Sequence, residues 1–344
     1  MRSTVLFIIL GTGLLFSIYG MVNARPKLFY TVANKRQVGN VDLMVNDGRF
    51  YWISSAWGSF FKYDPKKGNF TRKIFKGGAN IEGVMSMEVV EGRVWVGLFT
   101  LGVGMYNSET DDFTYYNQKD GIASYKAGNK DICRITAIAY DKHTNKVWLG
   151  SLKDAGVTVY NMVTKKWTIL DDPAFKSLDV SSIAVSKEYV VIAASGRKGV
   201  YYLDKIKNEW NYCGELPFAT GVVGRLTDLY IDEKFITFLV IDQRSVVQYN
   251  IDTKQYSIFY RFEENIKPQG MTKYKDYLIF STNHGVIFYN IKNKKMKAFN
   301  RAYGLVSNWT NSVYIEGDDM WVLTQEGISK AKIQDVLKEL TEID

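Results

Sequence analysis

The chain has 344 residues, of which 46% are hydrophobic and 15% aromatic, and its formal net charge is +8 at pH 7. This composition provides enough apolar material for a large core, which excludes a disordered chain, and five prolines exclude a collagen-like one. Two cysteines are too few for a disulfide scaffold, and neither has the spacing of a metal site.

The first 24 residues have the composition of a targeting segment. Arg2 is their only charge, residues 3–22 are apolar or small, and Ala24 ends a stretch that a signal peptidase would recognise. We expect cleavage after Ala24. The alternative is an uncleaved anchor, because about 20 apolar residues can span a bilayer. Both interpretations predict export to the periplasm or the extracellular space, and we expect membrane contact only if residues 3–22 are retained.

A short motif recurs six times after this segment. In each copy a large apolar residue is followed by Asn or Asp, and six residues after that Asn or Asp comes another large apolar residue. The six copies run over residues 63–70, 106–113, 160–167, 203–210, 249–256 and 289–296. An Asn or Asp side chain can bond the backbone two residues further on, which begins a turn. Such constant spacing indicates a structural repeat, and the copies are 40–54 residues apart.

Each repeat is predicted to form one four-stranded blade. The second repeat shows the pattern best, with alternating apolar residues at 84–90, 94–99, 103–107 and 113–117. The second strands of the other repeats are expected at 50–54, 147–151, 189–195, 235–241 and 277–282.

The seventh repeat, residues 311–333, lacks a fourth strand. Residues 27–32 precede the first repeat and can supply that strand, which would close a ring and remove its exposed edges. The sequence therefore predicts an all-β, seven-bladed β-propeller over 25–333. The tail, 334–344, is expected to form an amphipathic helix, because Ile333, Val336 and Leu340 share one helical stripe. We expect it to pack on the propeller; the alternative is a docking helix for a partner.

Two stretches resemble a known family. Residues 92–122 and 304–328 are similar to the repeats of two-component regulator propellers, which carry a Trp-x-Gly-like second strand, then Gly and a Tyr-Asn/Asp turn. The matching Trp positions here are Trp52, Trp95, Trp148 and Trp321. The resemblance covers about 25–333 and implies a seven-bladed propeller that acts as an extracytoplasmic sensor. Only a short tail follows the repeats, so we expect a binding or scaffold module without its own kinase, as an accessory of a membrane complex.

Antiparallel strand order places the loops between second and third strands on the same face as the blade-to-blade loops. We call this the top face. The predicted binding residues on it are Trp57, Phe99, Asp154, Arg197, Asp242, Arg244, His284, Trp309 and Glu326. This mixture of charges and aromatic anchors suits a protein or a polar ligand such as a glycan. The plainer interpretation is that these are ordinary solvated loop residues.

Catalysis is the alternative function. A lyase or hydrolase would use His284 as a general base, with carboxylates from Glu82, Asp154, Asp179, Asp242 and Glu326 near the central channel. No catalytic motif supports this, and we expect no cofactor and no metal. The lysines are scattered without a basic block on one element, which favours a soluble basic surface over a nucleic-acid site. The alternative there is an anionic partner. We expect a monomer.

Overall fold

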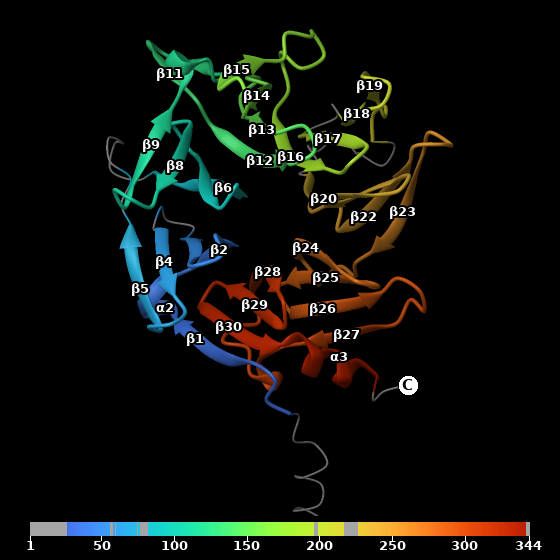
Figure 1. The fold of residues 1–344 in the computed structure, drawn as a ribbon. Coiled ribbons are helices and arrows are strands. Elements are labelled where there is room, and N and C mark those ends of the chain that lie inside the picture. Colours follow the sequence, from blue (N-terminus) through green and yellow to red (C-terminus); the bar gives the residue numbers. More distant parts are fainter. Residues whose placement is uncertain are drawn as a thin grey trace, which may run out of the picture.

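Seven four-stranded antiparallel sheets form a ring in the computed structural model, and the predicted all-β propeller is confirmed (Figure 1). The structure describes residues 26–341 except 56–57, 59, 74, 76–81, 196–198 and 217–225. The predicted targeting segment, residues 1–24, lies outside the described residues. No helix among the described residues is long and apolar enough to cross a membrane.

The strands of each blade follow one another from the centre of the ring outward. Blade 1 consists of β2 (Val41–Asn46), β3 (Tyr51–Ser55), β4 (Phe60–Asp64) and β5 (Asn69–Lys73). Blade 2 consists of β6 (Val84–Val90), β7 (Arg93–Leu98), β8 (Val103–Asn107) and β9 (Asp112–Tyr116). Blade 3 consists of β12 (Ile135–Asp141), β13 (Lys146–Ser151), β14 (Val157–Asn161) and β15 (Lys166–Ile169). Blade 4 consists of β16 (Val180–Val185), β17 (Tyr189–Ala194), β18 (Val200–Asp204) and β19 (Glu209–Tyr212). Blade 5 consists of β20 (Leu226–Asp232), β21 (Phe235–Val240), β22 (Ser245–Asn250) and β23 (Gln255–Arg261). Blade 6 consists of β24 (Pro268–Tyr274), β25 (Tyr277–Thr282), β26 (Gly285–Asn290) and β27 (Met296–Phe299).

Blade 7 joins the two ends of the chain. It consists of β28 (Thr310–Glu316), β29 (Asp319–Thr324), β30 (Gly327–Lys332) and, as its outermost strand, β1 (Tyr30–Asn34). Tyr30 lies opposite Lys330 and Asn34 opposite Gly327 in the β1–β30 ladder. Closure by the N-terminal strand is therefore as predicted, a few residues later than expected. A four-residue helix, α2 (Lys35–Val38), then leads into β2.

Two features were not predicted from the sequence. The innermost strand of blade 1, β2, was missed, although it completes the inner wall of the ring next to β28 and β6. The long connection between blades 2 and 3 contains a short 3-10 helix, η1 (Gln118–Asp120), and a two-stranded hairpin of β10 (Tyr125–Ala127) and β11 (Lys130–Ile132). The extra length of this repeat is therefore an ordered hairpin outside the blade sheets.

The six repeated motifs form the same structure in every copy. The side chain of each motif Asn or Asp accepts a hydrogen bond from the backbone N–H two residues further on, as predicted. The two large residues of each motif lie directly opposite each other in the ladder of the third and fourth strands. The pairs are Tyr63 with Phe70, Tyr106 with Phe113, Tyr160 with Trp167, Leu203 with Trp210, Tyr249 with Tyr256, and Tyr289 with Met296.

The core is divided into seven clusters of buried side chains, one at each contact between adjacent blades. The second strands contribute to clusters on both of their faces, so they read as nearly continuous buried runs. The repeat tryptophans Trp52, Trp95, Trp148 and Trp321 are all buried in these clusters. Their role is structural, since each fills the space between two blades.

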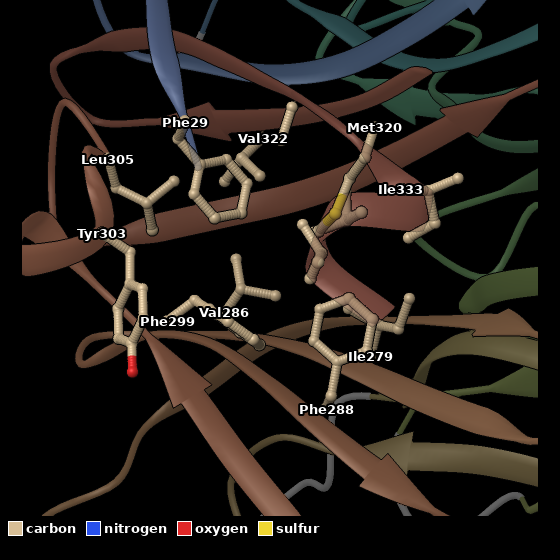
Figure 2. Close-up of a cluster of buried hydrophobic side chains, with 13 residues drawn as sticks. Phe29, Ile279, Val286, Phe288, Phe299, Tyr303, Leu305, Met320, Val322 and Ile333 are labelled. Carbon is tan, nitrogen blue, oxygen red and sulfur yellow. The ribbon is translucent and has the colours of Figure 1, made fainter. Parts of the chain in front are cut away.

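The cluster between blades 6 and 7 also holds both ends of the described chain. Figure 2 shows Phe29 from the N-terminal segment beside Val286 and Phe299, with Ile333 from the start of α3 (Ile333–Thr341) on the other side. Val336 of α3 is fully buried in this cluster, and Lys297 Nζ lies 2.7 Å from Glu339 Oε1. The apolar stripe of the tail therefore packs on the propeller itself. A chain that begins at residue 25 keeps every strand and helix of this ring.

Candidate functional site

The top face is built from pairs of loops joined by backbone hydrogen bonds. In blades 2, 3, 4, 6 and 7, the residue that follows the second strand donates its N–H to the preceding blade-to-blade loop. These bonds run from Phe99 to Gly83, Leu152 to Arg134, Ser195 to Asp179, Asn283 to Lys267 and Gln325 to Trp309. Their lengths of 2.7–3.2 Å are those of ordinary amide hydrogen bonds. Each second-to-third loop is thus fixed to its neighbour.

Two predicted binding residues, Trp57 and Arg197, lie outside the described residues. The other seven lie on the top loops of blades 2, 3, 5, 6 and 7, as the strand order requires.

Phe99 is the clearest candidate for direct contact with a partner. Its side chain is 39% exposed, and the guanidinium carbon of Arg134 lies 3.7 Å from its ring centroid. Arg134 Nε also donates to the Phe99 carbonyl oxygen at 3.3 Å, and Tyr125 of β10 lies 5.7 Å from the same guanidinium. The ring and the carbonyl of Phe99 together hold the guanidinium in place. The three residues form a platform at the junction of blades 2 and 3.

The floor beside this platform is polar. Glu82 is almost fully buried, and its carboxylate accepts hydrogen bonds from the backbone N–H of Thr100 at 3.1 Å and from the Thr100 hydroxyl. This carboxylate therefore stabilises the loop that carries Phe99. The structure therefore gives Glu82 a structural role in this loop.

Asp154 lies on the neighbouring loop of blade 3. Its backbone is left-handed, as is that of Lys153, and its N–H donates to Asp179 Oδ1 at 2.8 Å. Two consecutive non-glycine residues in this region are uncommon, and they turn the loop sharply at the rim. Both side chains are exposed there.

The predicted residues of blades 5 and 6 bind a blade-to-blade loop. Arg244 Nη1 donates to the Glu264 carbonyl oxygen. His284 Nε2 lies 3.2 Å from the Asn265 carbonyl oxygen, to which Asn283 also donates at 3.0 Å. His284 therefore holds this loop through a backbone carbonyl. Asp242, on the same loop as Arg244, is exposed.

Glu326 and Trp309 lie together at blade 7. The Glu326 carboxylate pairs with Arg301 of the blade 6–7 connection, and Arg301 also donates to the Val306 carbonyl oxygen at 3.0 Å. Trp309 is half-buried, immediately before the innermost strand β28, and its carbonyl accepts the bond from Gln325. Glu326 is thus already neutralised by Arg301.

The predicted residues share a face but act as separate local pairs around its rim. Among the residues that the structure describes, no group of three or more His, Cys, Asp and Glu is arranged to hold a metal ion. Sequence reasoning missed Arg134 and Arg301, because their partners come from other loops. The one sequence signal for these two residues is that each arginine lies close to a blade-to-blade junction.

A second concave feature lies on the opposite, bottom face, between blades 1 and 2. It is a polar surface cavity of about 200 Å³, lined by Asp47, Arg93, Tyr106, Glu109 and Tyr116 among others. Trp52 Nε1 donates to Asp47 Oδ2 at 2.8 Å, and Lys62 donates to the Tyr106 hydroxyl at 2.9 Å. Burial and the Asp111 carboxylate raise the pKa of Tyr106, so this hydroxyl stays protonated.

The fold and its closure define a seven-bladed β-propeller, and comparison with solved structures gives the same class. The extracellular domain of the putative one-component system BT4673 from B. thetaiotaomicron has a TM-score of 0.67 and 17% identity. PorZ, a bacterial surface component of the type-IX secretion system of Porphyromonas gingivalis, has a TM-score of 0.56 and 15% sequence identity. YCF48 bound to D1 peptide has a TM-score of 0.64 and 8% sequence identity. The predicted resemblance to two-component regulator propellers is thus confirmed for the fold.

These similarities extend over most of this chain but not of every neighbour. The alignment with the BT4673 domain covers 89% of this chain and 40% of that domain. The alignment with PorZ covers 89% of this chain and 39% of PorZ, and the alignment with YCF48 covers 90% of this chain and 96% of YCF48. The chain therefore spans about two-fifths of the length of the first two proteins. No family model matches the sequence, and no curated protein does.

Proposed function

We propose that this chain is an exported, non-catalytic propeller that binds a protein or a polar ligand such as a glycan through its top face. The observation that carries the proposal is the Phe99–Arg134–Tyr125 platform, where an exposed ring is held by a stacked guanidinium. Exposed aromatic and arginine side chains in a fixed geometry bind partners at low entropic cost.

The structural neighbours support the same class of function. One is an extracellular domain, one is a bacterial surface component of a secretion system, and one is bound to a peptide. An accessory role in a membrane complex agrees with these neighbours and with the predicted targeting segment.

The test is affinity capture from host envelope extract with residues 25–344, repeated with the Phe99→Ala/Arg134→Ala double variant. The controls change one exposed aromatic residue and one arginine away from the top face: Tyr30→Ala on the outer strand of blade 7 and Arg93→Ala on the bottom face. A partner retained by the controls and lost in the double variant is the expected result. If the double variant retains every partner, the platform is not the binding surface.

A glycan array probed with the same four proteins separates the two ligand classes. Binding of one glycan class, lost only in the double variant, would identify the ligand as a glycan. Export is tested separately by N-terminal sequencing of the chain recovered from the envelope. A chain that begins at Arg25 is expected after cleavage, and recovery from the cytoplasm alone would contradict export.

A further inference from the structure

Exposed apolar side chains concentrate on blades 3 and 4. Seven large hydrophobic side chains of the described residues are exposed, and four of them belong to these two blades. Val163 and Ile206 are the most exposed, at 73% and 83%, and Ile169 and Tyr212 follow at 45% and 49%. The two blades adjoin in the ring, with β15 and β19 at its outer edge (Figure 1).

These four residues occupy equivalent positions in their repeats. Val163 and Ile206 each lie two residues after the Asn or Asp that begins the turn between the third and fourth strands. Ile169 and Tyr212 each lie two residues after the large residue that ends the motif. In the other four motifs, the position of Val163 holds a charged residue: Lys66, Glu109, Asp252 or Lys292. The aliphatic tips are therefore specific to blades 3 and 4.

The turns that carry the tips are held in one conformation. The N–H of Val163 donates to Asn161 Oδ1 at 2.9 Å, and the N–H of Ile206 donates to Asp204 Oδ1 at 3.0 Å. The N–H groups of the next residues donate to the same oxygens, which fixes both turns. The two aliphatic side chains are thus presented to solvent by ordered turns, and they gain no contact with the core in exchange.

The bottom turns of blades 3 and 4, which carry both tips, are rich in lysine. The third-to-fourth and first-to-second turns of each blade lie together on the bottom face, since Met162 N–H donates to Asn145 and Lys205 N–H donates to Glu188. The lysines of these turns that form no ion pair with the described residues are Lys142, Lys146, Lys165, Lys166 and Lys187. The exposed carboxylates among them are Glu188 and Glu209. This region carries a net positive charge.

We propose that the bottom rim of blades 3 and 4 binds the surface of an anionic lipid bilayer. Val163 and Ile206 occupy the same position in the third-to-fourth turns of adjacent blades, so both can face one planar surface. Aliphatic tips that enter the headgroup region and lysines that face anionic lipid are the two contributions such binding requires. Val163 and Ile206 are 73% and 83% exposed, which suits the deformable, planar surface of a bilayer. This surface is independent of the top face and of any retained anchor.

The test is co-flotation of residues 25–344 with vesicles made of equal parts phosphatidylcholine and phosphatidylglycerol. We expect binding at low salt that weakens as salt is raised, and little binding to pure phosphatidylcholine. Val163→Ser/Ile206→Ser should lower the partition coefficient about tenfold or more, because two exposed aliphatic groups no longer enter the interface. Lys165→Gln/Lys166→Gln should lower it several-fold.

The matched control is Lys66→Gln/Lys67→Gln, which removes two lysines from the equivalent turn of blade 1, where no aliphatic tip occurs. It should bind like the parent protein. Insertion is read directly from Ile206→Cys carrying an environment-sensitive dye, because Cys133 and Cys213 are both buried. A blue shift with anionic vesicles, absent for Lys66→Cys, supports the proposal. Failure of the parent to bind, or equal binding by the tip variant, overturns it.

Discussion

The ammonium group of Lys205 in blade 4 lies 2.6 Å from Oδ2 of Asp141 in blade 3, and both side chains are nearly buried. Asp141 also accepts from the N–H of His143 at 3.1 Å and from the Thr144 hydroxyl at 2.7 Å. Burial alone would raise the pKa of Asp141, but the bonds from Lys205 and Thr144 outweigh it and hold that pKa below its usual value. This ion pair joins two blades through their bottom turns.

Removing the cation of this pair should destabilise the ring in a pH-dependent way. A depressed carboxyl pKa contributes stability above the unfolded value, and that contribution is lost as the pH falls through the folded value. Lys205→Met should therefore cost about 3 kcal/mol at pH 7, and the difference from the parent should shrink below about pH 4. Urea unfolding at both pH values measures it. The Asp141→Asn/Lys205→Met variant should recover part of the loss; a cost independent of pH would contradict the argument.

Glu88 should show the opposite pH dependence. This residue lies on the innermost strand β6, where burial raises the pKa of its carboxyl to about 7 and the hydrogen bond from the Val89 N–H, at 3.1 Å, offsets only part of that rise. A raised carboxyl pKa lowers stability as the pH rises from the unfolded to the folded value. Glu88→Gln should therefore stabilise the protein by up to about 3 kcal/mol at pH 8 and change little at pH 4. Thermal unfolding at the two pH values is the measurement, and equal effects at both would contradict it.

The ladder that closes the ring depends on close backbone approach at Gly327. Its φ is +127°, and a Cβ there would overlap the Ala33 carbonyl oxygen of β1. Gly327→Ala should therefore loosen β1 and cost more than about 2 kcal/mol. Gly317→Ala is the matched control, because Gly317 also has positive φ but a Cβ there meets no atom within 4 Å. Chemical unfolding and limited proteolysis near residue 35 compare the two variants. If both lose the same free energy of unfolding, backbone strain at positive φ explains the loss and the contact with Ala33 does not.

Helix α3 is expected to contribute to stability through its buried face. Val336 is fully buried among side chains of blades 6 and 7, so Val336→Ser should cost about 1–3 kcal/mol by losing apolar contacts and burying a hydroxyl. Lys338→Ser, two residues away on the exposed face, should change stability by less than about 0.5 kcal/mol. The urea midpoints of the two variants give the comparison. Similar midpoints would show that the helix is not part of the cooperative unit.

Local sequence signals predicted those features that depend on contacts between residues close in sequence. The turn-forming Asn161 and the pair of Tyr160 with Trp167 follow from one six-residue spacing, because a hairpin fixes its own register. The closing strand could be inferred because an unpaired edge requires a partner. The fold was therefore predictable before any contact was known.

The arrangement of the candidate site was not predictable in the same way. Phe99 and Arg134 are far apart in the sequence, and only the approach of two loops stacks one on the other. The exposure of Ile206 was missed for a different reason. Periodicity treats an aliphatic residue as a core residue, whereas this one lies within a turn that exposes it to solvent.

The pairing of Tyr30 with Lys330 also imposes an order of events on synthesis. β1 is among the first strands to leave the ribosome, yet its partner strand is made 300 residues later. Until then the first strand has no ladder to join, and the two blade faces that flank the gap stay open to solvent. Contacts this distant in sequence form slowly. The last step of folding is therefore the joining of the two ends, and a nascent chain that lacks β30 should be the most aggregation-prone species of this protein.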